Sequence, residues 1–171
     1  MSEEVEQAPT PLGAPPSGGA REGPQDTEGL EESLLVVRIG ETQLGIETSF
    51  VERLLANDLP RTQVPGAPSH VLGVINHRGA AVAVFDVLGF LGIPCGDEKA
   101  KRLVVVRAAS MSAAIPVHSI TGIRRVPMSE LRRGEDSGAL PHTLGLFDLG
   151  EVPTHLLDLP RLLQAAAARA A

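Results

Sequence analysis

The sequence predicts an all-β protein built from two similar small β-barrels, and three observations lead to that fold class. Short apolar runs of strand length recur at roughly ten-residue spacing between Gly and Pro residues, which is typical of small barrels. One hairpin-like stretch returns in weaker form in the second half of the chain. Hydrophobic residues make up 43% of the 171 residues, yet Trp and Tyr are absent and Phe occurs four times. We therefore expect one domain with an aliphatic core.

The clearest element is the stretch from Val71 to Leu88, where two apolar runs flank a polar centre. The centre contains Asn76, Arg78 and Gly79, which predicts a strand, a tight reversal and a second strand. Gly79 supplies a residue that adopts a positive φ without steric cost. The sequence therefore predicts a hairpin that presents Arg78 at its tip.

An internal repeat relates the two halves of the chain. The interval from Gly73 to Asp86 returns from Gly145 to Asp158, with Leu before each Gly and two apolar residues before each Asp. The match extends backwards, because the apolar positions of residues 44–54 return in residues 114–123 at a nearly constant offset. Two similar sheet units in one domain are expected, since the period is too long and the copies are too few for a solenoid.

Other apolar runs predict further strands. These runs cover residues 34–39, 43–46, 101–108 and 112–117, with an extended piece over residues 59–64 and a polar loop over residues 132–142. A short helix is also expected after Thr48 or Ser49, either of which can cap it. It would place Val51, Leu54 and Leu55 on one face and end near residue 57.

Two more helices are predicted where the repeated aspartates stand. Asp86 can cap a short helix through Phe90, which Gly92 and the following Pro would end. Asp158 can cap a longer helix over residues 159–168. Pro160 fits the first turn of that helix, because its missing N–H would have no helical partner there.

Residues 1–33 differ in composition from the folded domain expected over residues 34–171. They are rich in Pro, Gly, Glu and Ser with little apolar periodicity, which predicts a disordered tail. The eight acids of this tail outnumber Arg21, its one basic residue, by seven, so the net charge of −6 leaves the remainder near +1. A nearly neutral domain argues against nucleic-acid binding. The tail itself can be a solubilising spacer or, less in keeping with its composition, a docking segment.

The sequence also argues against membrane insertion and catalysis. No run approaches the roughly 20 apolar residues that span a bilayer, and no export segment starts the chain, so we expect a cytoplasmic protein. The five histidines show no metal-ligand spacing, and phosphate-loop, dinucleotide and nucleophile-elbow motifs are absent. Asp86 and Asp158 can be paired acids, but their symmetric positions favour helix caps. Cys95, between Pro and Gly, is expected to be a loop residue and not a nucleophile. We expect no enzyme, no cofactor and no metal, which leaves a binding surface.

These residues resemble a known family. An apolar-x-Gly-Val-Ile-Asn-x-Arg-Gly hairpin whose second strand ends in Asp, an upstream Val-Pro-x-x-Pro at residues 64–68, and a second half that repeats the first are similar to the CheW-like domain of bacterial chemotaxis adaptors. The resemblance covers about residues 34–165. It implies two interlocked five-stranded SH3-like barrels with short helices and a C-terminal helix. It also implies a non-enzymatic scaffold that couples the cytoplasmic tips of chemoreceptors (methyl-accepting chemotaxis proteins) to a CheA-type histidine kinase, in membrane receptor arrays.

The resemblance also suggests which residues bind the partners. Asn76, Arg78 and Gly79 match the signature hairpin, and Gly73 with Val74 match the apolar strand beside the receptor groove. The expected partner-binding residues are Val51, Leu54, Gly73, Val74, Asn76, Arg78 and Gly79.

Several positions depart from the family pattern. Two residues after Val51, where an acid is thought to pair with the hairpin arginine, the chain has Arg53, with Glu52 one place away. On a helix, neighbours point about 100° apart, so Glu52 is not expected to replace that acid. The family usually has Leu in the hairpin, Pro on the following strand and an Asp that opens a helix of the second unit. This chain has His77, Ala83 and His118 at these three positions. The alternative function is a diverged adaptor that binds the receptor, has lost kinase coupling and tunes or insulates a non-standard chemosensory system for motility or development.

Overall fold

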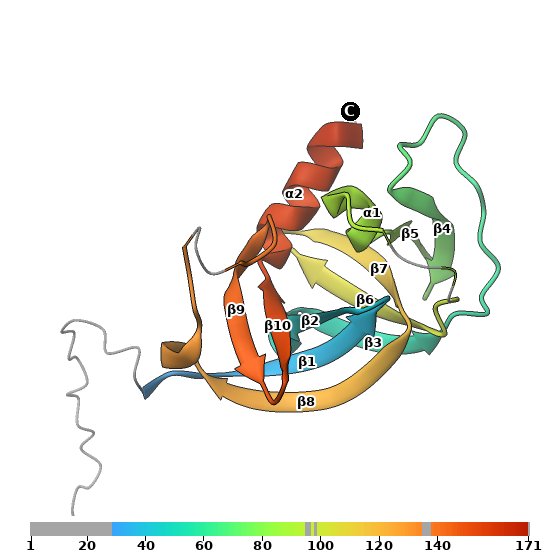
Figure 1. Cartoon of the computed structure of the whole chain (residues 1–171). Helices are drawn as coiled ribbons and strands as arrows, with labels where there is room; N and C mark the ends of the chain where they lie inside the picture. The colour runs from blue at the N-terminus through green and yellow to red at the C-terminus, as the bar shows by residue number, and fades with distance from the viewer. Residues whose placement is uncertain (1–28, 95–96, 98, 135–137, 171) are drawn as a thin grey trace, which may run out of the picture.

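The structure is a computed structural model that describes residues 29–94, 97, 99–134 and 138–170. Within these residues, strands arrange into two five-stranded sheets, with two α-helices beside them (Figure 1). The strands are β1 (Glu31–Ile39), β2 (Thr42–Glu47), β3 (Val51–Ala56), β4 (Val71–His77), β5 (Ala80–Phe85), β6 (Arg102–Ala108), β7 (Met111–Val117), β8 (Ser119–Pro127), β9 (Thr143–Leu149) and β10 (Val152–Leu157). The α-helices are α1 (Val87–Leu91) and α2 (Leu159–Ala170).

Each sheet takes strands from both halves of the repeat. The first sheet has the order β8-β1-β2-β10-β9, and the second has the order β3-β6-β7-β5-β4. The opening hairpin of each half therefore pairs with the later strands of the other half. In both sheets one parallel contact joins the halves, β10 with β2 and β5 with β7. The predicted fold class of two interlocked barrels is confirmed.

The central strands are buried on both faces, which explains their unbroken apolar sequences. Along β1, Leu35, Val37 and Ile39 point into a main cluster, while Leu34 and Val36 point into a smaller cluster. Strand β6 alternates in the same way between the main cluster and a third one. Strands buried on both faces have continuous apolar runs instead of alternating ones. The core thus has three layers, and it is mainly aliphatic, as predicted.

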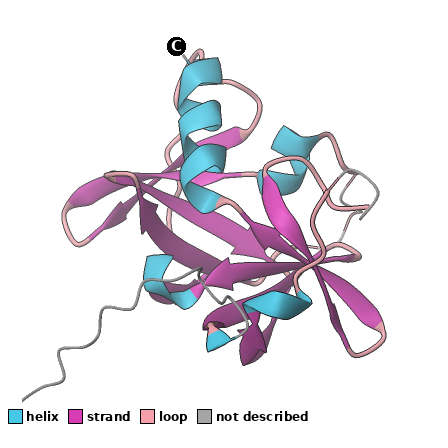
Figure 2. Cartoon of the chain, turned by 90° about the vertical axis from the view of Figure 1, so that its left-hand side faces the viewer, coloured by secondary structure: helices cyan, strands magenta, loops and turns pink. Residues whose placement is uncertain are grey.

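The two helices cover one end of the main cluster (Figures 1 and 2). Asp86 caps α1, since its side chain accepts a hydrogen bond from the Gly89 N–H at 2.9 Å, and Gly92 ends the helix with a φ of 75°. Asp158 accepts a longer bond from the Arg161 N–H at 3.4 Å at the start of α2. Both predicted caps are confirmed.

The helix predicted after Thr48 is wrong. A single 3-10 turn, η3 (Thr48–Phe50), has no side-chain cap, and β3 follows it at once. The segment pairs antiparallel with β6, where Leu54 lies opposite Val104. Backbone pairing with this buried strand outweighs the local pattern that suggested a helix. Val51 and Leu55 are half-buried, whereas Leu54 is 45% exposed.

Other boundaries also differ from the prediction. No helix follows Val117, because β8 begins at Ser119 after a buried His118, whose Nδ1 accepts a hydrogen bond from the Gly40 N–H at 2.8 Å. Strand β1 begins at Glu31, inside the predicted tail, and pairs there with Pro127. Tail residues 1–28 and Cys95 lie outside the described residues. The extended piece at residues 59–64 forms one bridge, between Thr62 and Val74. No helix in the described part of the chain is long and apolar enough to cross a membrane.

Candidate functional site

The β4–β5 hairpin displays Arg78 through a tight two-residue turn. Arg78 and Gly79 have φ values of 53° and 80°, the left-handed pair of a type I′ turn. The Asn76 side chain accepts a hydrogen bond from the Gly79 N–H at 3.0 Å, which braces the turn. The predicted hairpin is confirmed, and Arg78, Gly79 and Asn76 are all exposed at its tip.

Arg78 borders a surface depression of about 280 Å³ that we call the hairpin depression. Its lining residues come from five strands and the turn, and they are Glu52, His77, Arg78, Ala80, Val82, Arg107 and Ser112. Two arginines face one glutamate here, so the depression carries an excess of positive charge. It suits an acidic side chain of another molecule.

Glu52 reaches this depression because of a β-bulge. Val51 pairs with Val106 and Arg53 pairs with Val105, which leaves Glu52 as the extra residue of β3. The expectation that Glu52 could not take the place of the missing acid assumed a helix, and the strand removes that argument. In the structure Glu52 shares the hairpin depression with Arg78, although no ion pair joins these two among the described residues.

A second depression, which we call the junction depression, lies where the chain passes from one sheet to the other. It has a volume of about 510 Å³ and is lined by Leu54, Lys101, Arg102, His118, Ser119 and Ile120. Leu54 belongs to the second sheet, whereas Ser119 and Ile120 open β8 of the first sheet. Ile123, further along β8, is 65% exposed. This surface combines accessible aliphatic side chains with a basic rim.

Gly73 and Val74 hold β4 against the preceding loop. A Cβ on Gly73 would lie 2.9 Å from the Thr62 carbonyl oxygen, and Val74 and Thr62 exchange backbone hydrogen bonds of 2.8 and 2.9 Å. Gly73 is buried, so it can influence a partner only through the strand that it positions. Gly145 repeats this arrangement, with a Cβ position 2.5 Å from the Arg132 carbonyl oxygen.

The predicted site residues therefore fall into three places. Arg78 lies in the hairpin depression beside its bracing residues, Leu54 lies in the junction depression, and Gly73 lies beneath a loop. Val51 is half-buried and packs against the main core. Lining residues absent from the prediction include Glu52 and Arg107 in the hairpin depression and Ile120, Lys101 and Arg102 in the junction depression. Ile120 could have been found, because it is the repeat counterpart of Val51.

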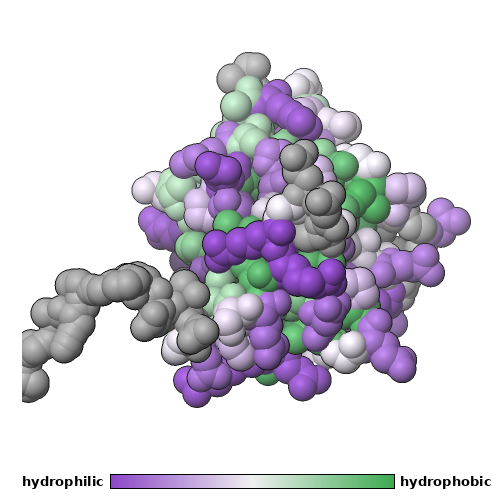
Figure 3. All heavy atoms as spheres, turned by 60° about the vertical axis from the view of Figure 1, so that its left-hand side comes forward, coloured by the Kyte–Doolittle hydropathy of each residue, from purple (hydrophilic) through white to green (hydrophobic). Residues whose placement is uncertain are grey.

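The described residues contain no cluster of three metal-ligating side chains. On the face seen in Figure 3, hydrophilic side chains cover most of the surface and apolar atoms show between them near the centre.

Burial lowers the pKa of His155, and burial together with Glu32 and Asp158 raises the pKa of Glu47. Neither group lines a depression, so the two surfaces are suited to binding by charge and apolar contact.

Fold and surface together define a protein-interaction module of two interlocked β-barrels. The family model described as CheW-like domain matches residues 33–167, and the chain belongs to this family. The members of the family are non-enzymatic scaffolds, so this chain is a scaffold and not an enzyme.

Similar proteins support this assignment. Protein FrzA of Myxococcus xanthus is 31% identical over 148 residues, which cover 82% of this chain and 90% of FrzA. Chemotaxis protein CheW of Thermotoga maritima is 28% identical over 59% of this chain and 66% of that protein. Protein PilI of Pseudomonas aeruginosa is 34% identical over 39% of this chain and 38% of its own length. The crystal structure of the scaffolding protein TtCheW from Thermoanaerobacter tengcongensis superposes with a TM-score of 0.70 at 18% identity, covering 82% of this chain and 93% of that one, which shows the shared fold.

Proposed function

We propose that this protein couples chemoreceptors to a CheA-type histidine kinase in a chemosensory pathway. The observation that carries the proposal is the junction depression, which is lined by the exposed Leu54 of the second sheet and the half-buried Ile120 of the first sheet. An adaptor without catalysis works by binding each partner through a separate surface. The junction and hairpin depressions share no lining residue, which suits them to two different contacts.

The receptor contact is assigned to the junction depression. An amphipathic helix binds a groove through apolar side chains spaced along one face. Leu54 and Ile120 offer the apolar contact, and Lys101 and Arg102 offer a basic rim for acids that flank the apolar stripe of that helix. In this proposal Val51 supports the surface from behind, since it packs against the same main cluster as Ile120.

The hairpin depression is assigned to the kinase contact. The backbone of Arg78 is held at the tip by a braced turn, so little backbone freedom is lost when the residue meets an acidic group. Arg107 lies in the same depression and adds a second positive charge. The proposal places the adaptor in the cytoplasm, with recruitment to receptor arrays through the junction depression.

A second candidate is a diverged adaptor that keeps the receptor contact and lacks the kinase contact. Its support is the position of Arg53, which stands exposed next to Glu52 where the family pattern has an acid. Relatives with names other than CheW, among them FrzA and PilI, fit a related chemosensory system as the setting.

Separate binding measurements test the proposal. A soluble fragment of the cognate receptor tip and the regulatory domain of the cognate kinase are each titrated against the wild type and Leu54→Ser. We expect Leu54→Ser to weaken receptor binding by roughly tenfold or more, because an apolar anchor is lost from a groove, and to leave kinase binding unchanged. Leu59→Ser is the matched control, since Leu59 is 36% exposed and lines neither depression.

The outcomes separate the candidates. Binding of both partners supports the coupling adaptor, and binding of the receptor alone supports the diverged adaptor. If neither partner binds the wild type, both candidates are wrong. If Leu54→Ser and Leu59→Ser behave alike, the receptor does not use the junction depression.

A further inference from the structure

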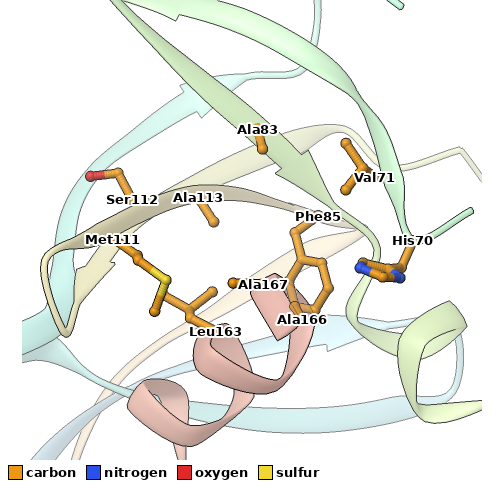
Figure 4. Close-up of a pocket in the computed structure, with 10 residues that line it drawn as sticks. All are labelled: His70, Val71, Ala83, Phe85, Met111, Ser112, Ala113, Leu163, Ala166 and Ala167. Atoms are coloured by element: carbon orange, nitrogen blue, oxygen red, sulfur yellow. The ribbon is translucent and has the colours of Figure 1, made fainter. Parts of the chain in front are cut away.

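An apolar pocket lies between α2 and the second sheet, apart from the two depressions (Figure 4). It has a volume of about 280 Å³, near the lower end for small-molecule sites, which start at roughly 300 Å³. The lining residues are His70, Val71, Ala83, Phe85, Met111, Ser112, Ala113, Leu163, Ala166 and Ala167. None of them is an acid, a lysine or an arginine. Only Ser112 also borders the hairpin depression.

One polar side chain in this lining is buried without a partner. His70 is 7% exposed, and its Nε2 has no hydrogen-bond partner among the described residues. The ring is fixed edge-on against Phe85 and Phe90, with centroid distances of 5.6 and 5.0 Å. Figure 4 shows it at one end of the pocket, beside Phe85. A buried nitrogen that has lost its water without gaining a partner is unfavourable, so native structures rarely keep one.

Water is a poor partner for this nitrogen. A buried water typically makes about three hydrogen bonds, and an apolar cavity stays dry. Among the lining side chains only His70 and Ser112 carry a strong hydrogen-bonding group, Ser112 is exposed, and the Met111 sulfur is a weak acceptor. A ligand that is apolar over most of its surface and polar at one point matches the lining of the pocket better than water does.

The remaining lining restricts the ligand further. Without a charged side chain the pocket cannot compensate an ion, so the ligand is neutral. The Phe85 ring and the Met111 thioether both make favourable contacts with an aromatic ring. The alanines Ala83, Ala113, Ala166 and Ala167 leave the space open. We propose that this pocket binds a small neutral aromatic molecule with one hydroxyl or N–H group, of the phenol or indole type, which hydrogen-bonds to His70 Nε2.

Phenol and toluene provide the test, because they differ mainly by a hydroxyl in place of a methyl group. Both are titrated at pH 8 into ¹⁵N-labelled full-length protein, with indole fluorescence as a second readout, since the chain has no Trp or Tyr. The phenol-to-toluene affinity ratio should fall roughly three- to tenfold in His70→Phe, because one neutral hydrogen bond is lost. His142→Phe is the control, since His142 contacts Phe90 at 5.5 Å and does not line the pocket. Its ratio should equal that of the wild type.

A second pair of variants tests the pocket itself without touching His70. Ala167 and Ala168 are both exposed on α2, but only Ala167 lines the pocket. Ala167→Leu should fill the mouth and weaken indole and phenol at least about tenfold, whereas Ala168→Leu should not. In the wild type, the ¹⁵N signal of His70 Nε2 should shift much more with phenol than with toluene, because only phenol donates a hydrogen bond to it. Absence of binding by phenol and indole, an unaffected Ala167→Leu, or an unchanged ratio in a folded His70→Phe would overturn the proposal.

Discussion

Glu52 and Arg78 border one depression although their strands lie at opposite ends of the strand order in the second sheet. Strand β3 stands at one end of that order, and the β4–β5 hairpin stands at the other. The two ends approach each other because the strongly twisted sheet curls toward closure. The charge around Arg78 is therefore set by the barrel as a whole and not by the hairpin alone.

Arg78→Ala should weaken binding of the kinase, to which the hairpin depression is assigned, at least about tenfold, because truncation of an interface arginine typically costs 2 kcal/mol or more. Its melting temperature should stay within a few degrees of the wild type, since an exposed charge contributes roughly 0–1 kcal/mol to stability. Calorimetric titration and thermal melts measure the two effects.

Arg161→Ala is the matched control for this prediction. The Arg161 side chain is 80% exposed, lies on α2 and borders neither depression. Equal binding by the wild type and Arg78→Ala would show that the hairpin is not part of the binding site. An unfolded Arg78→Ala would assign Arg78 to stability instead.

The repeated close approach at Gly73 and Gly145 gives a stability prediction. Both have positive φ values, 137° and 155°, and a Cβ at either would meet a backbone carbonyl at 2.9 or 2.5 Å. Gly145→Ala and Gly73→Ala should each lower the free energy of unfolding by about 3 kcal/mol, from strain and steric overlap together. Gly145→Ala should be the more severe, because its contact is the shorter one.

Gly122→Ala separates the two causes. Gly122 has a φ of 138°, but a Cβ there would meet nothing within 4 Å. Urea denaturation should show a loss of only about 1 kcal/mol, from backbone strain. If all three variants lose the same stability, the close approach at Gly73 and Gly145 contributes nothing.

Sequence reasoning reached the fold because its signals were local. Gly79 in the hairpin turn and Asp86 before α1 act within a few residues of themselves, and the structure confirms both. The exchange of strands between halves left no local signal, because β3 and β6 are far apart in the chain, and it was expected only from the resemblance to the family. The apolar positions of β3 also fitted a helix, and only pairing with the partner strand β6 decides that this segment is a strand and not a helix.

The residues of the candidate site also differ in whether a local sequence signal could predict them. Arg78 could be predicted because the turn that displays it is encoded beside it. Glu52 and Arg107 could not, since curling of the sheet and a bulge bring them to Arg78. Gly73 was predicted at a partner surface, and its close contact with Thr62 points to support of the strand.

His155 should make stability depend on pH below neutrality. Its Nδ1 accepts a hydrogen bond from the Leu140 N–H at 3.3 Å, and burial lowers its pKa from 6.5. The unfolded chain therefore binds a proton first as the pH falls below 6.5, and stability is lost until the folded pKa is reached. His155→Asn keeps an acceptor and removes the titration. Between pH 8 and pH 5.5 the urea midpoint should fall less for His155→Asn than for the wild type. If the midpoints of both proteins fall by the same amount, His155 is not the group responsible.

Glu47 should act in the opposite direction. Its carboxyl lies at the end of β2, where burial first, and then Glu32 and Asp158, raise its pKa above 4.5. The folded chain thus holds this proton more tightly than the unfolded chain, so stability is lost as the pH rises from 4.5 through the folded pKa. Glu47→Gln removes that loss and should melt at a higher temperature than the wild type at pH 7, with the gap closing below pH 4.5. Glu41→Gln removes the same formal charge from an exposed turn and should not raise the melting temperature. A Glu47→Gln protein that is less stable than the wild type at pH 7 would show that the ionised carboxylate is stabilised by its surroundings.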